Sequence, residues 1–421
     1  MKHALFIAFH YPPESSSSGV LRTLKFSRYL PQFGWRVTVI TLREDAYEQV
    51  DPTLLAQLPP EVKVVRTRYL NSKRHFAIAG YYPAVLAIPD RWIGWLPWAL
   101  AAARRVMRDD PADLVFSTSP MATAHMIAAR VAGRYRLPWV ADFRDPWYEE
   151  PPEPGTPAVV HWAARRLERV VAKRADRLVA TTEHMVDMLR TRYGDLVRDK
   201  TCAIVNGYDE GDFSGFPPPS TQRGARLDIV HAGQINAEFR DPRPLFKALR
   251  EAADAGWLDL ADVRVTFVGG GAYAQDPALA RAIAELRLQD SVSFAPRIPY
   301  DQALQRMAQA DLLLLLQASE DTRQLVPAKF YEYLRLRRPV LALLYDGATS
   351  QLLQRAQAGW SVHPDQGATL ARTLGDIVRL WKEQTLAARV ADLDFLRQYD
   401  RRHLTGLLAG HFDTLVGRDA S

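Results

Sequence analysis

The chain is organised around the stretch Val326-Pro-Ala-Lys-Phe-Tyr-Glu-Tyr-Leu-Arg-Leu-Arg-Arg-Pro339, where a loop, a charged helix start and a buried strand meet. Before it, residues 310–316 form a short apolar run typical of a strand buried on both faces of a parallel sheet. Pro327 suits the first turn of a helix, and Val340–Leu344 reads as the next strand. A strand, a loop and a helix N-terminus in this order predict an anion site at the carboxyl edge of a sheet.

Two charged residues, Lys329 and Glu332, lie in the first turn of this expected helix, and they suit a phosphate and a ribose hydroxyl. Strand and helix patterns alternate along the rest of the chain, which predicts an α/β fold of parallel sheets covered on both faces. The expected strands are 4–9, 37–41, 62–65, 114–117, 139–141, 177–180, 202–205, 227–232, 264–268 and 292–294. The expected helices are 21–33, 98–108, 121–132, 159–174, 183–193, 244–255, 277–286 and 300–308.

The length of 421 residues exceeds what one hydrophobic core usually supports, roughly 250–300 residues, so we expect two domains. The best boundary is the segment around the three successive prolines at 217–219, which cannot continue regular structure. We predict an N-terminal domain over 1–212, a linker over 213–226, a C-terminal domain over 227–385 and a helical segment over 386–421 that returns to the N-terminal domain.

The composition favours an anionic partner, because the formal charge is +6 and the pI is near 9.3. Nucleotide diphosphates, anionic lipid and nucleic acid all fit, and so does a mildly basic surface without a partner. A single cysteine, Cys202, excludes an internal disulfide and fits a reducing compartment. The first residues read as a strand and not as a signal peptide, so we expect a cytoplasmic location.

One apolar segment, residues 76–103, is interrupted by Asp90, Arg91 and three prolines and is therefore not expected to span a membrane. Its tryptophans at 92, 95 and 98 have three readings: they meet a membrane interface, line an acceptor cleft, or pack in the core.

The loop Tyr11–Arg22 follows the first expected strand and holds Ser18, Gly19 and Arg22. In a doubly wound domain such a loop offers backbone N–H groups to an anion. It is neither a Walker loop nor a Gly-x-Gly-x-x-Gly fingerprint, and its four serines also suit a surface turn.

The motif Asp142-Phe-Arg-Asp-Pro-Trp147 follows another expected strand. Asp142 and Asp145 flank Arg144, and such carboxylates bind sugar hydroxyls, orient an acceptor or act as a base. The alternative is a structural ion network, since these charges need partners when buried.

The C-terminal half opens with a loop that holds Gly233, Gln234 and Arg240. The glycine permits close backbone approach, and the two longer side chains can reach a diphosphate across an interdomain cleft. Gly270, the middle of three glycines at 269–271, admits a ribose or base, or it forms a simple tight turn.

Together these pieces resemble the retaining glycosyltransferases of the GT-B fold, specifically glycosyltransferase family four. The resemblance covers nearly the whole chain and rests on the order and spacing of its motifs. The motifs are Tyr11-Pro-Pro with Ser18-Gly19 and Arg22, Gly34-Trp-Arg-Val-Thr-Val-Ile-Thr41, Asp142–Trp147, Val205-Asn-Gly-Tyr-Asp209, Val268-Gly-Gly-Gly271 and Lys329–Tyr333 with Arg338-Pro339-Val340.

The resemblance implies two Rossmann-like, doubly wound domains that face each other across a cleft, with the nucleotide sugar on the C-terminal one. Glu332 matches the family's ribose-binding glutamate, while Gln324 stands where the family has its sugar-binding glutamate. Gln234 takes the position of an expected arginine, and Arg240 matches the cation that grips the diphosphate. No metal and no cofactor besides the donor are implied.

Roles follow from the same resemblance. Arg240 and Lys329 would stabilise the leaving diphosphate, and Asp142 or Asp145 would orient the acceptor. The expected substrate-binding residues are Ser18, Gly19, Arg22, Gly233, Gln234, Gly270, Gln324, Val326 and Glu332.

We therefore expect a retaining, metal-independent transferase that moves a hexose-type sugar from a nucleotide diphosphate to a hydroxyl. The expected acceptor is a polyprenyl-linked saccharide of surface polysaccharide assembly, at the inner face of the plasma membrane. Gln324 and Gln234 motivate the alternative of a non-catalytic partner subunit. A nucleotide-sugar epimerase is a further alternative within the fold, and nucleic-acid binding lacks any motif.

Overall fold

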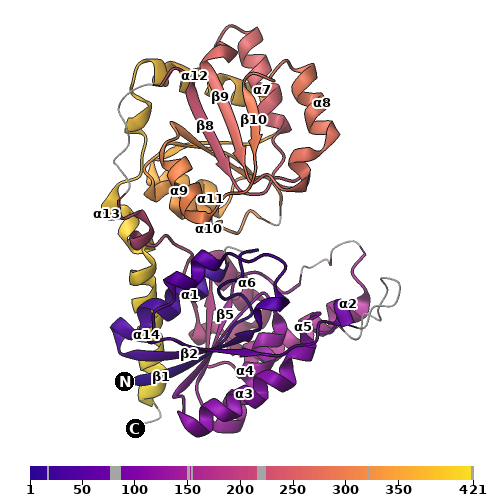
Figure 1. Cartoon of the computed structure of the whole chain (residues 1–421), viewed down its shortest axis with the longest axis vertical. Helices are drawn as coiled ribbons and strands as arrows, with labels where there is room; N and C mark the ends of the chain where they lie inside the picture. The colour runs from indigo at the N-terminus through magenta and orange to yellow at the C-terminus, as the bar shows by residue number, and fades with distance from the viewer. Residues whose placement is uncertain are drawn as a thin grey trace. The chain divides into compact units, whose positions relative to one another are not determined.

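The computed structural model describes residues 1–16, 19–75, 87–148, 152, 155–215, 224–320 and 322–418. The chain folds as two compact units. Unit 1 comprises Met1–Asn206 and Arg401–Ser421, and unit 2 comprises Gly207–Asp400. Each unit is an α/β layer structure built on one sheet (Figure 1).

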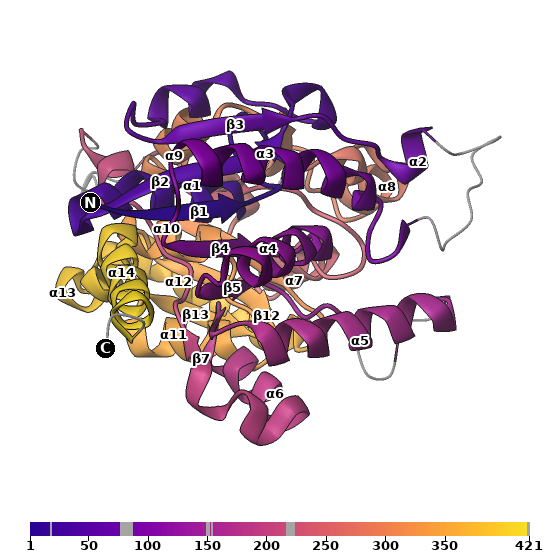
Figure 2. The ribbon, with the colours of Figure 1, turned by 90° about the horizontal axis from the view of Figure 1, so that it is seen from below.

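Unit 1 contains a seven-stranded, wholly parallel sheet in the order β3-β2-β1-β4-β5-β6-β7. Figure 2 labels all of these strands except β6. Its central strands are apolar on both sides because helices cover both faces. The strands are β1 (Lys2–Ile7), β2 (Trp35–Leu42), β3 (Lys63–Thr67), β4 (Leu114–Thr118), β5 (Trp139–Phe143), β6 (Arg177–Ala180) and β7 (Thr201–Ala203).

Two hydrophobic clusters sandwich this sheet. One cluster joins the sheet to α3, α4, α5 and α6, and the other joins it to α1 and α14. The helices of unit 1 are α1 (Gly19–Tyr29), α2 (Ser72–His75), α3 (Leu96–Asp109), α4 (Ala122–Tyr135), α5 (Ala158–Arg174), α6 (Glu183–Tyr193) and α14 (Arg401–Arg418).

Unit 2 contains a six-stranded parallel sheet in the order β10-β9-β8-β11-β12-β13. The strands are β8 (Leu227–Ala232), β9 (Val263–Val268), β10 (Val292–Ala295), β11 (Leu312–Gln317), β12 (Val340–Leu344) and β13 (Gly359–Val362). The helices are α7 (Arg243–Asp254), α8 (Pro277–Glu285), α9 (Tyr300–Ala308), α10 (Ala328–Arg335), α11 (Ala348–Ala356), α12 (Gly367–Lys382) and α13 (Leu393–Leu396).

Strand order reverses between β1 and β4 in unit 1 and between β8 and β11 in unit 2. In open parallel sheets, ligands bind outside the carboxyl ends of the strands at such a reversal, because the flanking loops separate there. The loops after β1, β4, β8 and β11 are therefore the places to look for function.

The strands expected from apolar runs all form, and β6, β8 and β12 have the predicted bounds. Three elements were not predicted. β13 and α2 are only four residues long and carry no long apolar run, and α11 was missed although the Ser350 hydroxyl accepts a hydrogen bond from the Gly347 backbone at its start. The segment over 386–421, expected to be helical, contains the short α13 and the long α14, and α12 precedes it. Within the described part of the chain, no helix combines the length and apolar character that a membrane crossing needs.

The C-terminal helix α14 is part of the core of unit 1. Phe412 is fully buried and meets the rings of Phe6, Trp35 and Phe116. Residues that lie at the two ends of the sequence thus share one hydrophobic cluster.

We predict that Phe412→Ala destabilises unit 1 by about 3–5 kcal/mol, because it opens a cavity among rings that cannot collapse fully. Urea unfolding measures the change. Leu407→Ala on the same helix is the matched control, since Leu407 is 45% exposed and its loss should cost within about 0.5 kcal/mol. Equal effects of the two variants would contradict the packing.

Candidate functional site

Lys329 lies at the reversal point of the unit 2 sheet and is the second residue of α10. Its Nζ donates a hydrogen bond to the carbonyl oxygen of Ala232, at the end of β8, over 2.9 Å. The side chain therefore lies where β8 and β11 part, as the strand, loop and helix order predicted.

Gly233 makes room for this lysine. A Cβ at position 233 would lie 2.5 Å from Lys329 Nζ, and the backbone φ of +129° is one that other residues rarely adopt. The backbone conformation favours glycine, and a larger residue would also have to displace the flexible end of the Lys329 side chain.

The electrostatics of this point favour an anion. Burial, with a smaller contribution from Arg240, lowers the pKa of Lys329 to about 7, against the opposing effect of Glu332. Burial also lowers the pKa of Arg240. Neither side chain forms an ion pair with a carboxylate among the described residues, and the Arg240 guanidinium lies over the ring of Phe239, 4.9 Å from its centroid. Two partly desolvated basic groups that repel each other are stabilised when an anion arrives.

Glu332 is buried one turn further along α10. Its Oε1 accepts a hydrogen bond from the Tyr300 hydroxyl on α9 over 2.8 Å. The carboxylate is thus fixed in orientation by a second helix, which is what a hydroxyl-binding group needs.

The loop between β11 and α10 is shaped by Gln317, the last residue of β11. Its Nε2 donates to the carbonyl oxygens of Thr322 and Leu325, at 2.7 and 3.0 Å, and its Oε1 accepts from Thr349 at 2.9 Å. Val326 is buried beneath the loop, while Gln324 is exposed. These hydrogen bonds tie the described part of the loop to β11 and α11, so that α10 begins at the sheet edge.

The glycines after β9 lie against the loop after β8. The backbone N–H of Ile235 donates to the Gly270 carbonyl at 3.2 Å, and a Cβ at Gly270 would lie 2.7 Å from that of Ala274. Gln234 is exposed beside Gly271. The structure thus brings Gly233, Gln234, Gly270, Lys329 and Arg240 to one edge of unit 2.

In unit 1, Asp142 and Arg22 form a buried ion pair. Arg22 Nη2 lies 2.7 Å from Asp142 Oδ1, and the Thr118 hydroxyl donates to Oδ2 over 2.8 Å. Arg22 Nη1 donates to the Val205 carbonyl over 3.0 Å. Both carboxylate oxygens are engaged, so the structural ion network offered as an alternative describes Asp142, and Arg22 is its partner.

The neighbouring motif residues are differently placed. Gly19 begins α1, and a Cβ there would lie 1.7 Å from the guanidinium of Arg144, which is thereby seated against the helix start. Asp145 is half-buried beside Arg144 and accepts no hydrogen bond from the described residues, so it is the carboxylate of the motif that can meet a ligand. Ser18 lies outside the described residues.

Sequence reasoning missed a buried dyad in the loop after β1. His10 Nδ1 lies 2.7 Å from Glu14 Oε2, and Glu14 Oε1 also accepts from the Ser16 backbone. Desolvation pushes the pKa of Glu14 up, but the His10 and Ser16 contacts outweigh it and lower it. Histidine and glutamate four positions apart were the available signal, although a loop gives such spacing no fixed meaning.

Two of the three tryptophans in the apolar segment, Trp92 and Trp95, pack in the core of unit 1. Trp95 is fully buried and donates from Nε1 to the Thr67 hydroxyl over 2.7 Å, and Trp92 packs on Phe9 with ring centroids 4.8 Å apart. Of the three readings, core packing describes these two, while Trp98 is half-buried on α3. Within the described residues, no group of three His, Cys, Asp or Glu could hold a metal ion.

Comparison with known families finds one likeness in sequence. The model of the glycosyl transferase 4-like domain matches residues 19–207, a little under half of the chain. The sequence resemblance to GT-B glycosyltransferases is confirmed for this domain and, through the structural likenesses, for the fold. No curated protein matches the chain in sequence.

Solved structures share the fold over the full length. Anabaena HepE in complex with UDP and glucose is 18% identical with a TM-score of 0.67, and 99% of this chain and 100% of that chain are covered. Sucrose-phosphate synthase from Thermosynechococcus elongatus is 15% identical with a TM-score of 0.65 and the same coverage. A glycosyltransferase from Rickettsia africae is 14% identical with a TM-score of 0.60, covering 99% of each chain. These likenesses show that the chain has the GT-B fold.

We predict that Arg22→Met destabilises the chain by about 3–5 kcal/mol, because it leaves the Asp142 carboxylate buried and unpaired. The double change Arg22→Met with Asp142→Leu should recover most of this loss in urea unfolding. Arg36→Met is the surface control, since the Arg36 pair with Asp110 is exposed and worth about 0–1 kcal/mol. If Arg22→Met alone is no less stable to urea than Arg36→Met, the buried pair is contradicted.

A second prediction concerns pH. The pKa of Lys329 is about 7 in the folded chain and about 10.4 in an unfolded one, so the unfolded state binds more protons between these values. Stability should therefore rise with pH through this window, and Lys329→Met should remove that rise. Lys247→Met, at an exposed lysine of α7, is the control and should leave it. Urea midpoints across the window measure the effect, and a rise that persists in Lys329→Met would refute the assignment.

Proposed function

We propose that the chain transfers a sugar from a nucleotide diphosphate to a hydroxyl acceptor, with unit 2 as the donor site. The observation that carries the proposal is the pair Lys329 and Arg240, two desolvated basic groups at the reversal point of a parallel sheet that form no ion pair with any carboxylate the structure describes. A diphosphate supplies the missing charge. The UDP and glucose bound to HepE support a uridine diphosphate sugar as donor.

The donor's parts have natural partners in unit 2. The diphosphate would meet Lys329, Arg240 and the free backbone N–H groups at the start of α10. Glu332, oriented by Tyr300, would accept hydrogen bonds from the ribose hydroxyls. Gln324 is exposed and can hydrogen-bond the sugar. Gly233 and Gly270 have no side chain, so the ligand can approach the backbone there.

The chemistry we propose is retaining and independent of metal. The bond from the anomeric carbon to the diphosphate breaks, and its electron pair goes to the leaving phosphate. The acceptor oxygen bonds to the same face of that carbon, and the leaving phosphate takes the acceptor's proton. Preorganised cations stabilise the charge that develops, commonly the largest part of such rate enhancement.

The acceptor is proposed to be a polyprenyl-linked saccharide of surface polysaccharide assembly, bound by unit 1. Asp145 is its candidate orienting group, since Asp142 is committed to Arg22. His10, held by Glu14 in the loop after β1, is a second polar group at the same sheet edge.

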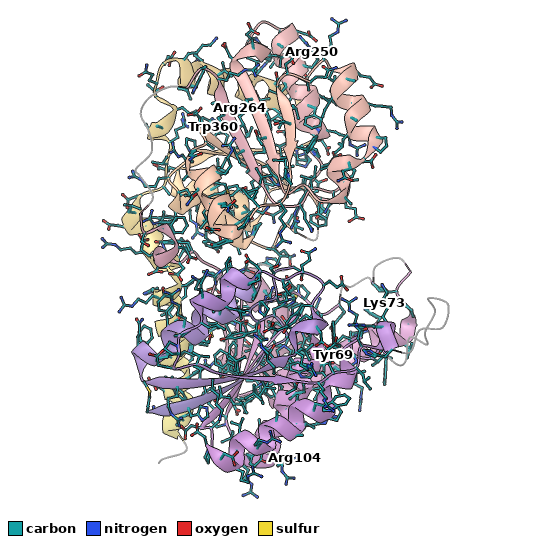
Figure 3. All side chains as sticks on the ribbon, viewed as in Figure 1. Tyr69, Lys73, Arg104, Arg250, Arg264 and Trp360 are labelled. Atoms are coloured by element: carbon teal, nitrogen blue, oxygen red, sulfur yellow. The ribbon has the colours of Figure 1, made fainter. Side chains whose placement is uncertain are left out.

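We expect uridine diphosphate to raise the melting temperature of the wild type, because a ligand that binds only the folded state stabilises it in proportion to occupancy. Arg240→Ala should weaken binding about tenfold to a hundredfold, as the loss of a charged hydrogen bond does. Arg250→Ala is the control, since Arg250 lies on α7 and pairs with Asp254 (Figure 3). Titration calorimetry measures both.

The same titrations run with UDP-, GDP-, dTDP- and ADP-sugars identify the nucleotide, and Glu332→Ala tests the ribose contact. Transfer to an added saccharide separates a transferase from a non-catalytic subunit, and donor consumption without an acceptor indicates an epimerase. If no nucleotide binds a chain that melts cooperatively, the donor site is refuted.

A further inference from the structure

Three helices form a basic layer over one face of the unit 1 sheet. α3, α4 and α5 lie side by side, with α4 in the middle (Figure 2). Their exposed cations are Arg104, Arg105, Arg108, Arg130, Arg134, Arg165, Arg166, Arg169, Lys173 and Arg174. Figure 3 shows Arg104 on the outer side of α3.

Carboxylates are almost missing from these three helices, all of whose residues are described. Asp109 is exposed and pairs with Arg108 over 2.8 Å, and Glu168 is buried. α4 and α5 therefore offer no exposed acid to neutralise their cations within the layer. Glu149, Glu150 and Glu153 precede α5 in the sequence and lie outside the described residues, so this charge count covers the helices alone.

The outer face of α5 also exposes apolar groups. Trp162 is 62% exposed, Val159 is 48% exposed and Val170 is 38% exposed. Arg166 lies over the Trp162 ring at 5.9 Å, one turn away. Trp162, Arg166, Arg169 and Lys173 follow each other at helical spacing, so one stripe carries both the aromatic group and the cations.

We propose that this layer, with Trp162 at its apolar point, docks unit 1 on an anionic lipid bilayer. A helix that lies in a membrane interface has this composition: cations that meet lipid headgroups beside a tryptophan that enters the boundary. A nucleic acid duplex would use the cations but leave Val159 and Val170 in water. The inference rests on the proposed lipid-linked acceptor, and it names the partner surface and the helices that meet it.

The test is co-sedimentation of the full chain with vesicles of phosphatidylglycerol and phosphatidylcholine in equal parts, against vesicles of phosphatidylcholine alone. The wild type should bind the anionic vesicles, and added salt should weaken binding. Trp162→Ala should reduce partitioning severalfold, and Arg169→Glu with Lys173→Glu should reduce it by about tenfold or more.

Unit 2 supplies matched controls. Trp257 is 42% exposed and has Arg372 over its ring at 5.7 Å, so Trp257→Ala removes a similar surface group. Lys247→Glu with Arg281→Glu reverses one exposed lysine and one exposed arginine. Both controls should partition like the wild type.

Three results overturn the proposal: a wild type that ignores anionic vesicles, controls that lose as much as the α5 variants, or a short DNA duplex bound more tightly than the vesicles. Melting curves establish that each variant is folded. Uridine diphosphate binding is measured on the same samples, so failure of the membrane surface is distinguishable from failure of the donor site.

Discussion

The hydrogen bond from Lys329 Nζ to the Ala232 carbonyl is the contact on which the candidate donor site depends. It places an amine with a pKa near 7 where β8 and β11 separate, beside Gly233, whose positive φ favours glycine. Arg240 adds a second desolvated charge, and Glu332 is fixed in orientation by Tyr300. The folded chain therefore holds an electrostatic cost in unit 2 that an anionic ligand relieves.

At the corresponding edge of the unit 1 sheet, the buried charges are paired with each other. Arg22 and Asp142 neutralise each other in the core, and Glu14 is held by His10 and Ser16. Charge that is satisfied internally gives a rigid edge that is not poised for a phosphate. The exposed charge of this unit lies instead on the outer helices α3, α4 and α5. We therefore propose a small anionic ligand for unit 2 and an extended anionic surface for unit 1.

Much of this could be predicted from the sequence, because buried parallel strands are continuous apolar runs and their loops meet at one edge. The position of Lys329 followed from that rule. The partner of Arg22 did not, since Asp142 is 120 positions away and a motif with two carboxylates gives no sign of which is buried. The roles of the tryptophans at 92 and 95 were also ambiguous, because the sequence does not show whether such side chains are buried. β13 was missed because Gly359-Trp-Ser-Val362 is short and half-polar.

A crystal structure of the chain with uridine diphosphate tests the central claim most directly. We expect density for the diphosphate within hydrogen-bond distance of Lys329 Nζ and the Arg240 guanidinium, with the ribose at Glu332. Bound nucleotide at any other place in the chain, with these three side chains untouched, would contradict it.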